Sequence, residues 1–155
     1  MSFEVRTDSL PGTATALGWA RGHTLVIDRP ADVGGQDLGF NGAELMHLAV
    51  AACVSNDLFR EARALGLRLT RVAVTARGEF TGSPQVSSGI DYSVEVWGDA
   101  PAEALRELVS RVDAIAEIPN SLRQGTVVRL SDARVHRADG AVAANPGRAG
   151  EEGSR

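Results

Sequence analysis

Cysteine is nearly absent from this sequence: Cys53 is the only one among 155 residues. A single thiol excludes a disulfide within the chain and excludes a zinc site built from several thiolates. The histidines His23, His47 and His136 show no metal-ligand spacing, and no glycine-rich stretch is followed by the Lys-Ser/Thr of a phosphate-binding loop. We therefore expect neither a metal nor an organic cofactor, and any chemistry at the thiol must be solitary or involve another molecule.

Long apolar runs and clusters of basic residues are also missing. No stretch approaches the roughly 20 apolar residues that cross a membrane, and residues 1–5 do not begin a secretion segment. The formal net charge is −4 and the arginines are scattered, which argues against binding to nucleic acid. The composition thus predicts a soluble, cytoplasmic protein with neither a membrane nor a nucleic acid as partner.

The C-terminal residues contain no aromatic side chain and are dominated by Gly, Ala, Pro and charged residues. Such a composition cannot bury enough apolar surface to offset the entropy of ordering. We expect residues 138–155 to form a disordered, dispensable tail. Residues 1–137, in a chain that is 43% hydrophobic, suit one globular domain.

The first forty residues carry the alternation of strands. Thr13 to Trp19 and His23 to Ile27 each place apolar or β-branched residues at every second position, and Arg21-Gly22 between them suits a tight hairpin. The glycines and proline of residues 29–41 favour an irregular loop. A loop of this length inside a small domain is often functional.

A long helix is predicted from Gly42 to Leu65, because this segment has no internal glycine or proline and precedes Gly66. Its first half, residues 45–54, is apolar on nearly every side. A single sheet covers only one side of a helix, and little of the chain is left to cover the other. A second subunit is the expected cover.

The remaining segments alternate strand and helix signals. Residues 71–77 and 90–96 predict a hairpin of two half-buried strands, and residues 101–115 predict an amphipathic helix that Pro119 closes. Residues 126–135 predict a last strand. The fold class is therefore α+β, with antiparallel strands and one long central helix.

Four local motifs stand out: Asp28-Arg29-Pro30, the stretch Gly34 to Gly39, the stretch Asn41 to Leu45, and Ala51-Ala52-Cys53. Together they resemble the OsmC/Ohr family, the osmotically inducible protein C-like and organic hydroperoxide resistance proteins. The resemblance implies an OsmC-like fold, in which antiparallel sheets pack on a long buried central helix. It also implies an intertwined homodimer with active sites at the subunit interface.

The resemblance assigns the family's chemistry to particular residues. Cys53 matches the helix cysteine that attacks a peroxide and becomes a sulfenic acid, and Arg21 resembles the arginine that organises its thiolate. Glu44 lies one residue after the position of the family's arginine-holding glutamate. Ile118, before Pro119, stands where the family has a second cysteine that resolves the sulfenic acid as a disulfide. An external thiol would have to replace that cysteine.

Three functions remain open from the sequence. The first is reduction of apolar organic hydroperoxides by Cys53, activated by Arg21 and regenerated by an external thiol. The second is an OsmC-like dimer without peroxidase turnover, which binds a small apolar ligand in its interface cavity. The third is a redox sensor with a solitary thiol. Each site residue also has an ordinary interpretation: Cys53 as a packed core residue, Arg21 as an exposed hairpin arginine, and Glu44 as a partner of the helix dipole.

Overall fold

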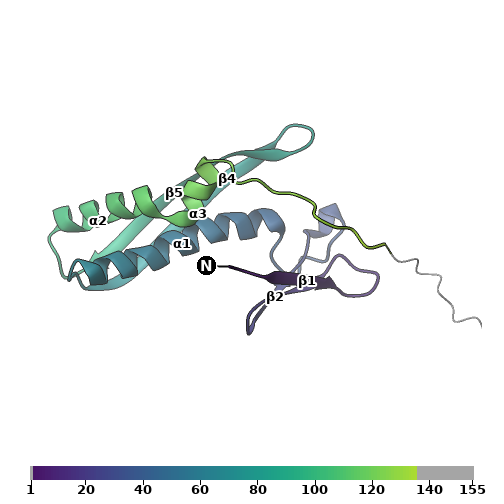
Figure 1. The fold of residues 1–155 in the computed structure, drawn as a ribbon, viewed down its shortest axis with the longest axis horizontal. Helices are drawn as coiled ribbons and strands as arrows, with labels where there is room; N and C mark the ends of the chain where they lie inside the picture. The colour runs from purple at the N-terminus through teal and green to yellow at the C-terminus, as the bar shows by residue number, and fades with distance from the viewer. Residues whose placement is uncertain (1, 136–155) are drawn as a thin grey trace, which may run out of the picture.

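The fold combines two antiparallel sheets with helices, as the computed structural model, which describes residues 2–135, shows (Figure 1). This confirms the predicted α+β class, whereas the tail predicted at residues 138–155 lies outside the described residues. In chain order the elements are β1 (Val5–Ser9), β2 (Ala16–Ala20), β3 (His23–Ile27), the 3₁₀ turn η1 (Ala31–Val33), α1 (Gly42–Ala64), β4 (Leu69–Thr81), β5 (Val86–Gly98), α2 (Ala102–Ile115) and α3 (Glu117–Arg123).

The N-terminal sheet has the strand order β1-β2-β3 and lies beside the N-terminal end of α1, away from α2 (Figure 1). The predicted hairpin at Arg21-Gly22 is confirmed, because Ala20 pairs with His23 across the turn. Arg21 has a φ of 55°, a left-handed conformation that tight turns require. Strand β1 was not predicted, because its five residues are all exposed and so carry no buried alternation.

Asp28 organises the loop that follows β3. Its side chain is 1% exposed, and its carboxylate accepts hydrogen bonds from the Thr15 hydroxyl and from the backbone N–H groups of Arg29, Gln36 and Leu38 at 2.8–3.3 Å. Burial raises the pKa of Asp28, but these four donors lower it more, so the net pKa lies below its ordinary value. The predicted irregular loop is thus a fixed structure around one buried carboxylate.

The long helix is confirmed and is closed at both ends by its own sequence. At the start of α1 the Asn41 side chain accepts from the N–H groups of Ala43 and Glu44, while the Glu44 carboxylate accepts from the Asn41 N–H at 2.8 Å. This reciprocal pair is a capping box. Gly66, at a φ of 70°, ends the helix in the left-handed conformation that glycine adopts without strain. None of the described helices has both the length and the apolar composition needed to cross a membrane.

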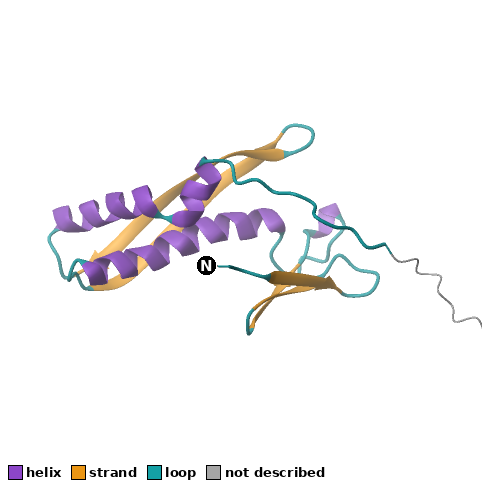
Figure 2. Ribbon diagram, in the orientation of Figure 1, coloured by secondary structure: helices purple, strands orange, loops and turns teal. Residues whose placement is uncertain are grey.

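The core lies between the C-terminal half of α1, α2 and one face of the β4–β5 hairpin (Figure 2). The opposite side of α1 is open in the single chain, where Leu48 is 48% exposed and Phe59 46%. Apolar side chains therefore cover only one side of the helix. The fully buried core residues, each at most 2% exposed, are Val54, Leu58, Ala62, Leu108, Val112 and Ala116.

A break in the backbone separates α2 from α3. Ala116, with φ of −59° and ψ of 122°, leaves the helical conformation, and α3 begins at the next residue. The prediction that Pro119 closes the second helix is wrong. Pro119 instead lies in the first turn of α3. Backbone N–H groups there have no partner within the helix, so proline can take this place without the loss of a hydrogen bond.

The strand predicted at residues 126–135 is also wrong. The segment is neither helix nor strand, and its apolar side chains point into solvent: Val128 is 90% exposed and Leu130 86%. Within the described part of the chain no strand pairs with it. An alternating pattern needs a neighbouring strand before it forms a ladder.

Replacing Asp28 with asparagine tests its role in the loop. Because the pKa of Asp28 is depressed in the folded state, its carboxylate stabilises the fold above the unfolded pKa, and this stabilisation is lost as the pH falls through the folded value. Asp28→Asn should therefore unfold at lower denaturant concentration than the wild type at pH 7. This gap between the two denaturation midpoints should narrow below about pH 4. Denaturation curves at several pH values measure it; a gap independent of pH would rule out the charged form as the stabilising one.

Candidate active site at Cys53

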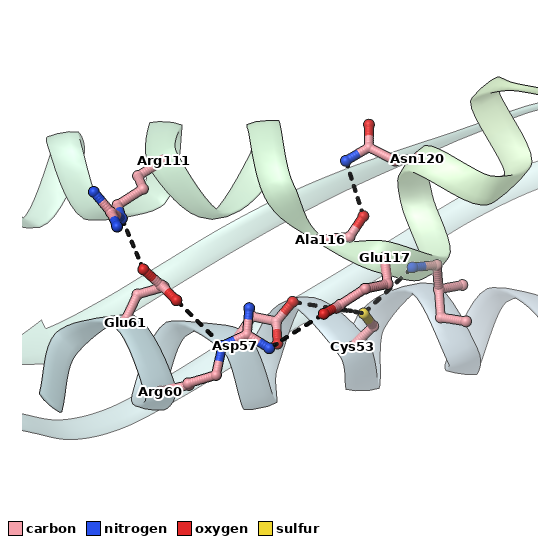
Figure 3. Close-up of polar contacts among 9 residues, drawn as sticks. Cys53, Asp57, Arg60, Glu61, Arg111, Ala116, Glu117 and Asn120 are labelled. Atoms are coloured by element: carbon pink, nitrogen blue, oxygen red, sulfur yellow. Dashed lines mark hydrogen bonds and ion pairs between the residues drawn. The ribbon is translucent and has the colours of Figure 1, made fainter. Parts of the chain in front are cut away.

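Cys53 lies where the middle of α1 meets the start of α3. Its Sγ atom accepts the Ile118 N–H at 3.5 Å and lies 3.7 Å from a carboxylate oxygen of each of Asp57 and Glu117 (Figure 3). The cysteine is partly buried. One thiol thus contacts one backbone donor and two acidic side chains.

Two features of the fold bring these groups together. Asp57 follows Cys53 by four residues on α1 and therefore shares its face of the helix. Glu117 and Ile118 come from the first turn of α3, which starts directly after the fully buried Ala116. Asp113 holds α3 in place by accepting from the Tyr92 hydroxyl and from the Arg123 guanidinium.

Arginines pair with the acidic groups of this region. Arg60 Nη1 lies 2.8 Å from Asp57 Oδ1 and 3.3 Å from Glu117 Oε1, so it bridges α1 and α3 (Figure 3). Glu61 is paired with Arg60 at 3.2 Å and with Arg111 of α2 at 2.7 Å. Arg60 uses the carboxylate oxygens that face away from sulfur, which leaves Oδ2 of Asp57 and Oε2 of Glu117 directed at Cys53.

The surroundings of Cys53 disfavour its thiolate. Burial raises the pKa of the thiol, the Ile118 N–H lowers it, and the negative charges of Asp57 and Glu117 raise it again. The net pKa lies above its ordinary value. In the single chain, therefore, the thiol is less reactive at neutral pH than a free cysteine.

The donor atoms of Cys53, Asp57 and Glu117 lie within 4.8 Å of one another, a spacing that metal ligands also show. Arg60 already pairs with both carboxylates. We assign no metal to this cluster and treat it as an ion-pair network around the thiol.

An apolar cavity of about 380 Å³ lies between α1, α3 and β5. It begins one turn before Cys53 on α1 and one residue after Ile118 on α3, but Cys53 itself does not line it. Its size suits a small molecule. The apolar part of its lining comprises Met46, Val50, Ile90, Pro119 and Leu122.

The residues predicted from the sequence lie in three separate places. Cys53 and Ile118 are in contact, as the alignment with the family's two cysteine positions predicts. Arg21 lies in the β2–β3 turn and Glu44 in the α1 capping box, and among the described residues no hydrogen bond or ion pair joins either one to Cys53. Their catalytic roles stay predictions.

Arg60 and Glu117 were missed as neighbours of the thiol. Arg60 had a usable signal, because it follows Asp57 by three residues on a helix and such pairs interact. Glu117 directly precedes Ile118, so the position expected for the resolving cysteine was an indirect signal that could have found it. No local pattern in the sequence distinguishes it from other exposed glutamates.

The family model for OsmC-like proteins matches residues 34–131. Similar solved structures include an OsmC-like protein from Mycoplasma pneumoniae, with 15% identity, a TM-score of 0.69, and coverage of 81% of this chain and 89% of that one. Another is a putative organic hydroperoxide resistance protein from Vibrio cholerae with captopril bound in one of its active sites, with 21% identity, a TM-score of 0.57, and coverage of 81% and 86%. No curated protein matches the sequence.

A third similar structure is an organic hydroperoxide resistance protein OsmC from Legionella pneumophila, with 16% identity, a TM-score of 0.56, and coverage of 79% of this chain and 90% of that one. At these identities the solved structures show a shared fold. The fold and the site thus define an α+β protein with a cysteine on its central helix. The chain belongs to the OsmC-like family, as the match over residues 34–131 shows.

Introducing a second thiol at Ile118 tests the geometry of the site. Since the Ile118 backbone N lies 3.5 Å from Sγ, Ile118→Cys should form a disulfide with Cys53 under mild oxidation. Thiol titration and peptide mapping without reductant measure the product. Leu122→Cys, one turn further along α3, is the matched control and should keep both thiols free. Two free thiols in Ile118→Cys would show that α3 does not begin over Cys53.

Proposed function

We propose that this protein reduces apolar organic hydroperoxides, with Cys53 as the peroxidatic thiol. The observation that carries the proposal is the contact between Cys53 Sγ and the backbone of Ile118, the position of the family's second cysteine. The partly buried thiol resembles the family's reactive cysteine, and a cavity whose apolar lining suits an apolar peroxide begins one helical turn away on α1. Solved relatives in the fold are named for hydroperoxide resistance, which supports the same assignment.

An external thiol completes the proposed cycle. Cys53 is the only cysteine of the chain, so its sulfenic acid can condense only with a thiol from another molecule or oxidise further. The site lies between two packed helices. Such a site admits a low-molecular-weight thiol more readily than a large reducing protein.

The proposal needs a cation at Cys53, because the thiol pKa is raised in the single chain. Arg60 does not supply it, since its guanidinium already pairs with Asp57 and Glu117. We assign this role to Arg21 acting across a homodimer, from the second chain, with Glu44 as the acid that holds it. An opposite charge beside a thiol lowers its pKa.

Exposed apolar side chains support the homodimer. Leu48 and Phe59 lie on the open side of α1. Val128 and Leu130 lie in residues 126–135, the segment that pairs with no strand among the described residues. A soluble monomer rarely leaves so much apolar surface uncovered. A second copy of the chain, intertwined with the first, would cover both regions.

A second candidate function is the binding of a small apolar ligand without peroxidase turnover. The 380 Å³ cavity and the two carboxylates beside the thiol favour it, because a cavity can persist where the reactivity of the cysteine is lost. The Vibrio cholerae relative holds captopril in one active site, which supports access of small molecules to sites of this fold.

The dimer predicts a sedimentation mass of twice the 16.3 kDa of one chain at micromolar concentration. Leu48→Arg should shift the mass toward a single chain, because it places a charge within the surface to be buried. Analytical ultracentrifugation measures both. A wild type that is folded, soluble and monomeric would remove the dimer and the shared site with it.

The peroxidase predicts consumption of cumene hydroperoxide with a monothiol reductant, and its loss in Cys53→Ser. A steady-state assay of peroxide consumption, run with monothiol and dithiol reductants, measures this. The predicted rate is at least about 100-fold above that of Cys53→Ser, a factor typical of positioned catalytic groups. Equal rates in both proteins, with tight binding of an apolar ligand, would favour the second function.

Arg21→Ala should raise the pH at which half of Cys53 is alkylated by iodoacetamide, because an opposite charge is lost from beside the thiolate. Arg6→Ala is the matched control, since Arg6 is an exposed arginine of the same sheet paired with Asp8. Its alkylation profile should match the wild type. If Arg21→Ala also matches it, Arg21 is an ordinary surface residue.

A further inference from the structure

Two carboxylates lie at the same 3.7 Å distance from Cys53 Sγ but in opposite environments. Asp57 is buried, with 5% of its surface exposed, whereas 65% of the Glu117 side chain is exposed. The Asp57 carboxylate is also oriented, because Arg60 holds Oδ1 at 2.8 Å while Oδ2 faces the sulfur (Figure 3). This difference separates a group that can exchange a proton with the thiol from one that mainly contributes charge.

We propose that Asp57 relays the proton of Cys53 during peroxide reduction. The inference rests on the proposed function. As Sγ attacks the terminal peroxide oxygen, the S–O bond forms and the O–O bond breaks. Asp57 Oδ2 takes the thiol proton and returns it to the departing alkoxide. Sulfur is oxidised to the sulfenic acid, the hydroperoxide is reduced to the alcohol, and no further reactant is needed.

The position of Asp57 fits this role for two reasons. It follows Cys53 by one helical turn, so the helix fixes Oδ2 beside Sγ without any other element. Burial raises the pKa of Asp57, Arg60 lowers it, and the charge of Glu117 raises it again, with a net value above the ordinary one. A carboxyl group with a raised pKa holds the thiol proton more readily, which general acid–base catalysis requires.

Glu117 lacks these properties. Its own backbone N–H, Asp57 and Arg60 hold its pKa below the ordinary value despite partial burial. Its exposed carboxylate exchanges protons with bulk water. We therefore assign Glu117 an electrostatic effect on the thiol, and assign Arg60 the positioning of Asp57.

A carboxylate that acts through its charge and one that relays a proton differ in how their replacement by an amide changes the oxidation rate of Cys53. Loss of negative charge beside Cys53 favours the thiolate, so Asp57→Asn and Glu117→Gln should both alkylate faster with iodoacetamide at pH 7, a reaction that needs no proton donor. Loss of the relay should slow oxidation of Cys53 by tert-butyl hydroperoxide in Asp57→Asn alone, by roughly 100-fold. Glu117→Gln should oxidise as fast as the wild type or faster.

Peracetic acid separates the relay from a structural role. Its leaving group is a carboxylate, which departs without a proton, so Asp57→Asn should react with it at least as fast as the wild type. The measurement is single-turnover loss of the Cys53 thiol in full-length protein with EDTA present, beside thermal melting of each variant.

The rates of the two oxidations and of alkylation together distinguish a relay from a structural role and from a charge effect. Slower oxidation by tert-butyl hydroperoxide with undiminished peracid oxidation and faster alkylation supports the relay. If Asp57→Asn is oxidised more slowly by both oxidants, Asp57 has a structural role. If its oxidation by tert-butyl hydroperoxide is unchanged or faster, Asp57 acts only through its charge. Either result overturns the inference. A wild type that is alkylated at Cys53 but inert to tert-butyl hydroperoxide overturns the proposed function and the relay with it, a result distinct from failure of Asp57→Asn alone.

Discussion

The packing of α1 on α2 fixes where α3 begins, and the surroundings of Cys53 depend on that position. Val54 and Leu58 of α1 meet Leu108 and Val112 of α2 in a core that excludes water, and each large apolar side chain buried there contributes about 1.5–3 kcal/mol. The buried Ala116 ends this contact. The chain turns at that residue, and the first turn of α3 consequently lies over Cys53, which directly precedes Val54 on α1.

This constraint gives Cys53 an unusual electrostatic setting. The same turn that brings the Ile118 N–H to the sulfur also brings the Glu117 carboxylate, while the helix itself supplies Asp57. The single chain thus holds its cysteine as a thiol. A function as a peroxidase requires both a cation from elsewhere and a path for the proton, which is why the proposals involve a second chain and Asp57.

The sequence predicted the parts of the fold that have local causes. The uninterrupted segment before Gly66 predicted α1, and alternation predicted β2 to β5. The resemblance to the OsmC/Ohr family, and no local pattern, implied that residue 118 lies near Cys53. Features set by distant contacts were missed. Nothing local marks Glu117 as a neighbour of the thiol, and the exposed β1 has no apolar period. The apolar pattern of residues 126–135 predicted a strand that has no partner among residues 2–135.

The mass of Cys53 after exposure to an organic hydroperoxide shows whether this residue is a peroxidatic thiol. Peptide mapping with dimedone present, a reagent that traps sulfenic acids, measures the product on the intact, folded protein. One dimedone adduct is expected at Cys53 and none in Cys53→Ser. An unmodified Cys53 in a folded protein after excess hydroperoxide would contradict the peroxidase proposal and leave ligand binding as the better explanation of the site.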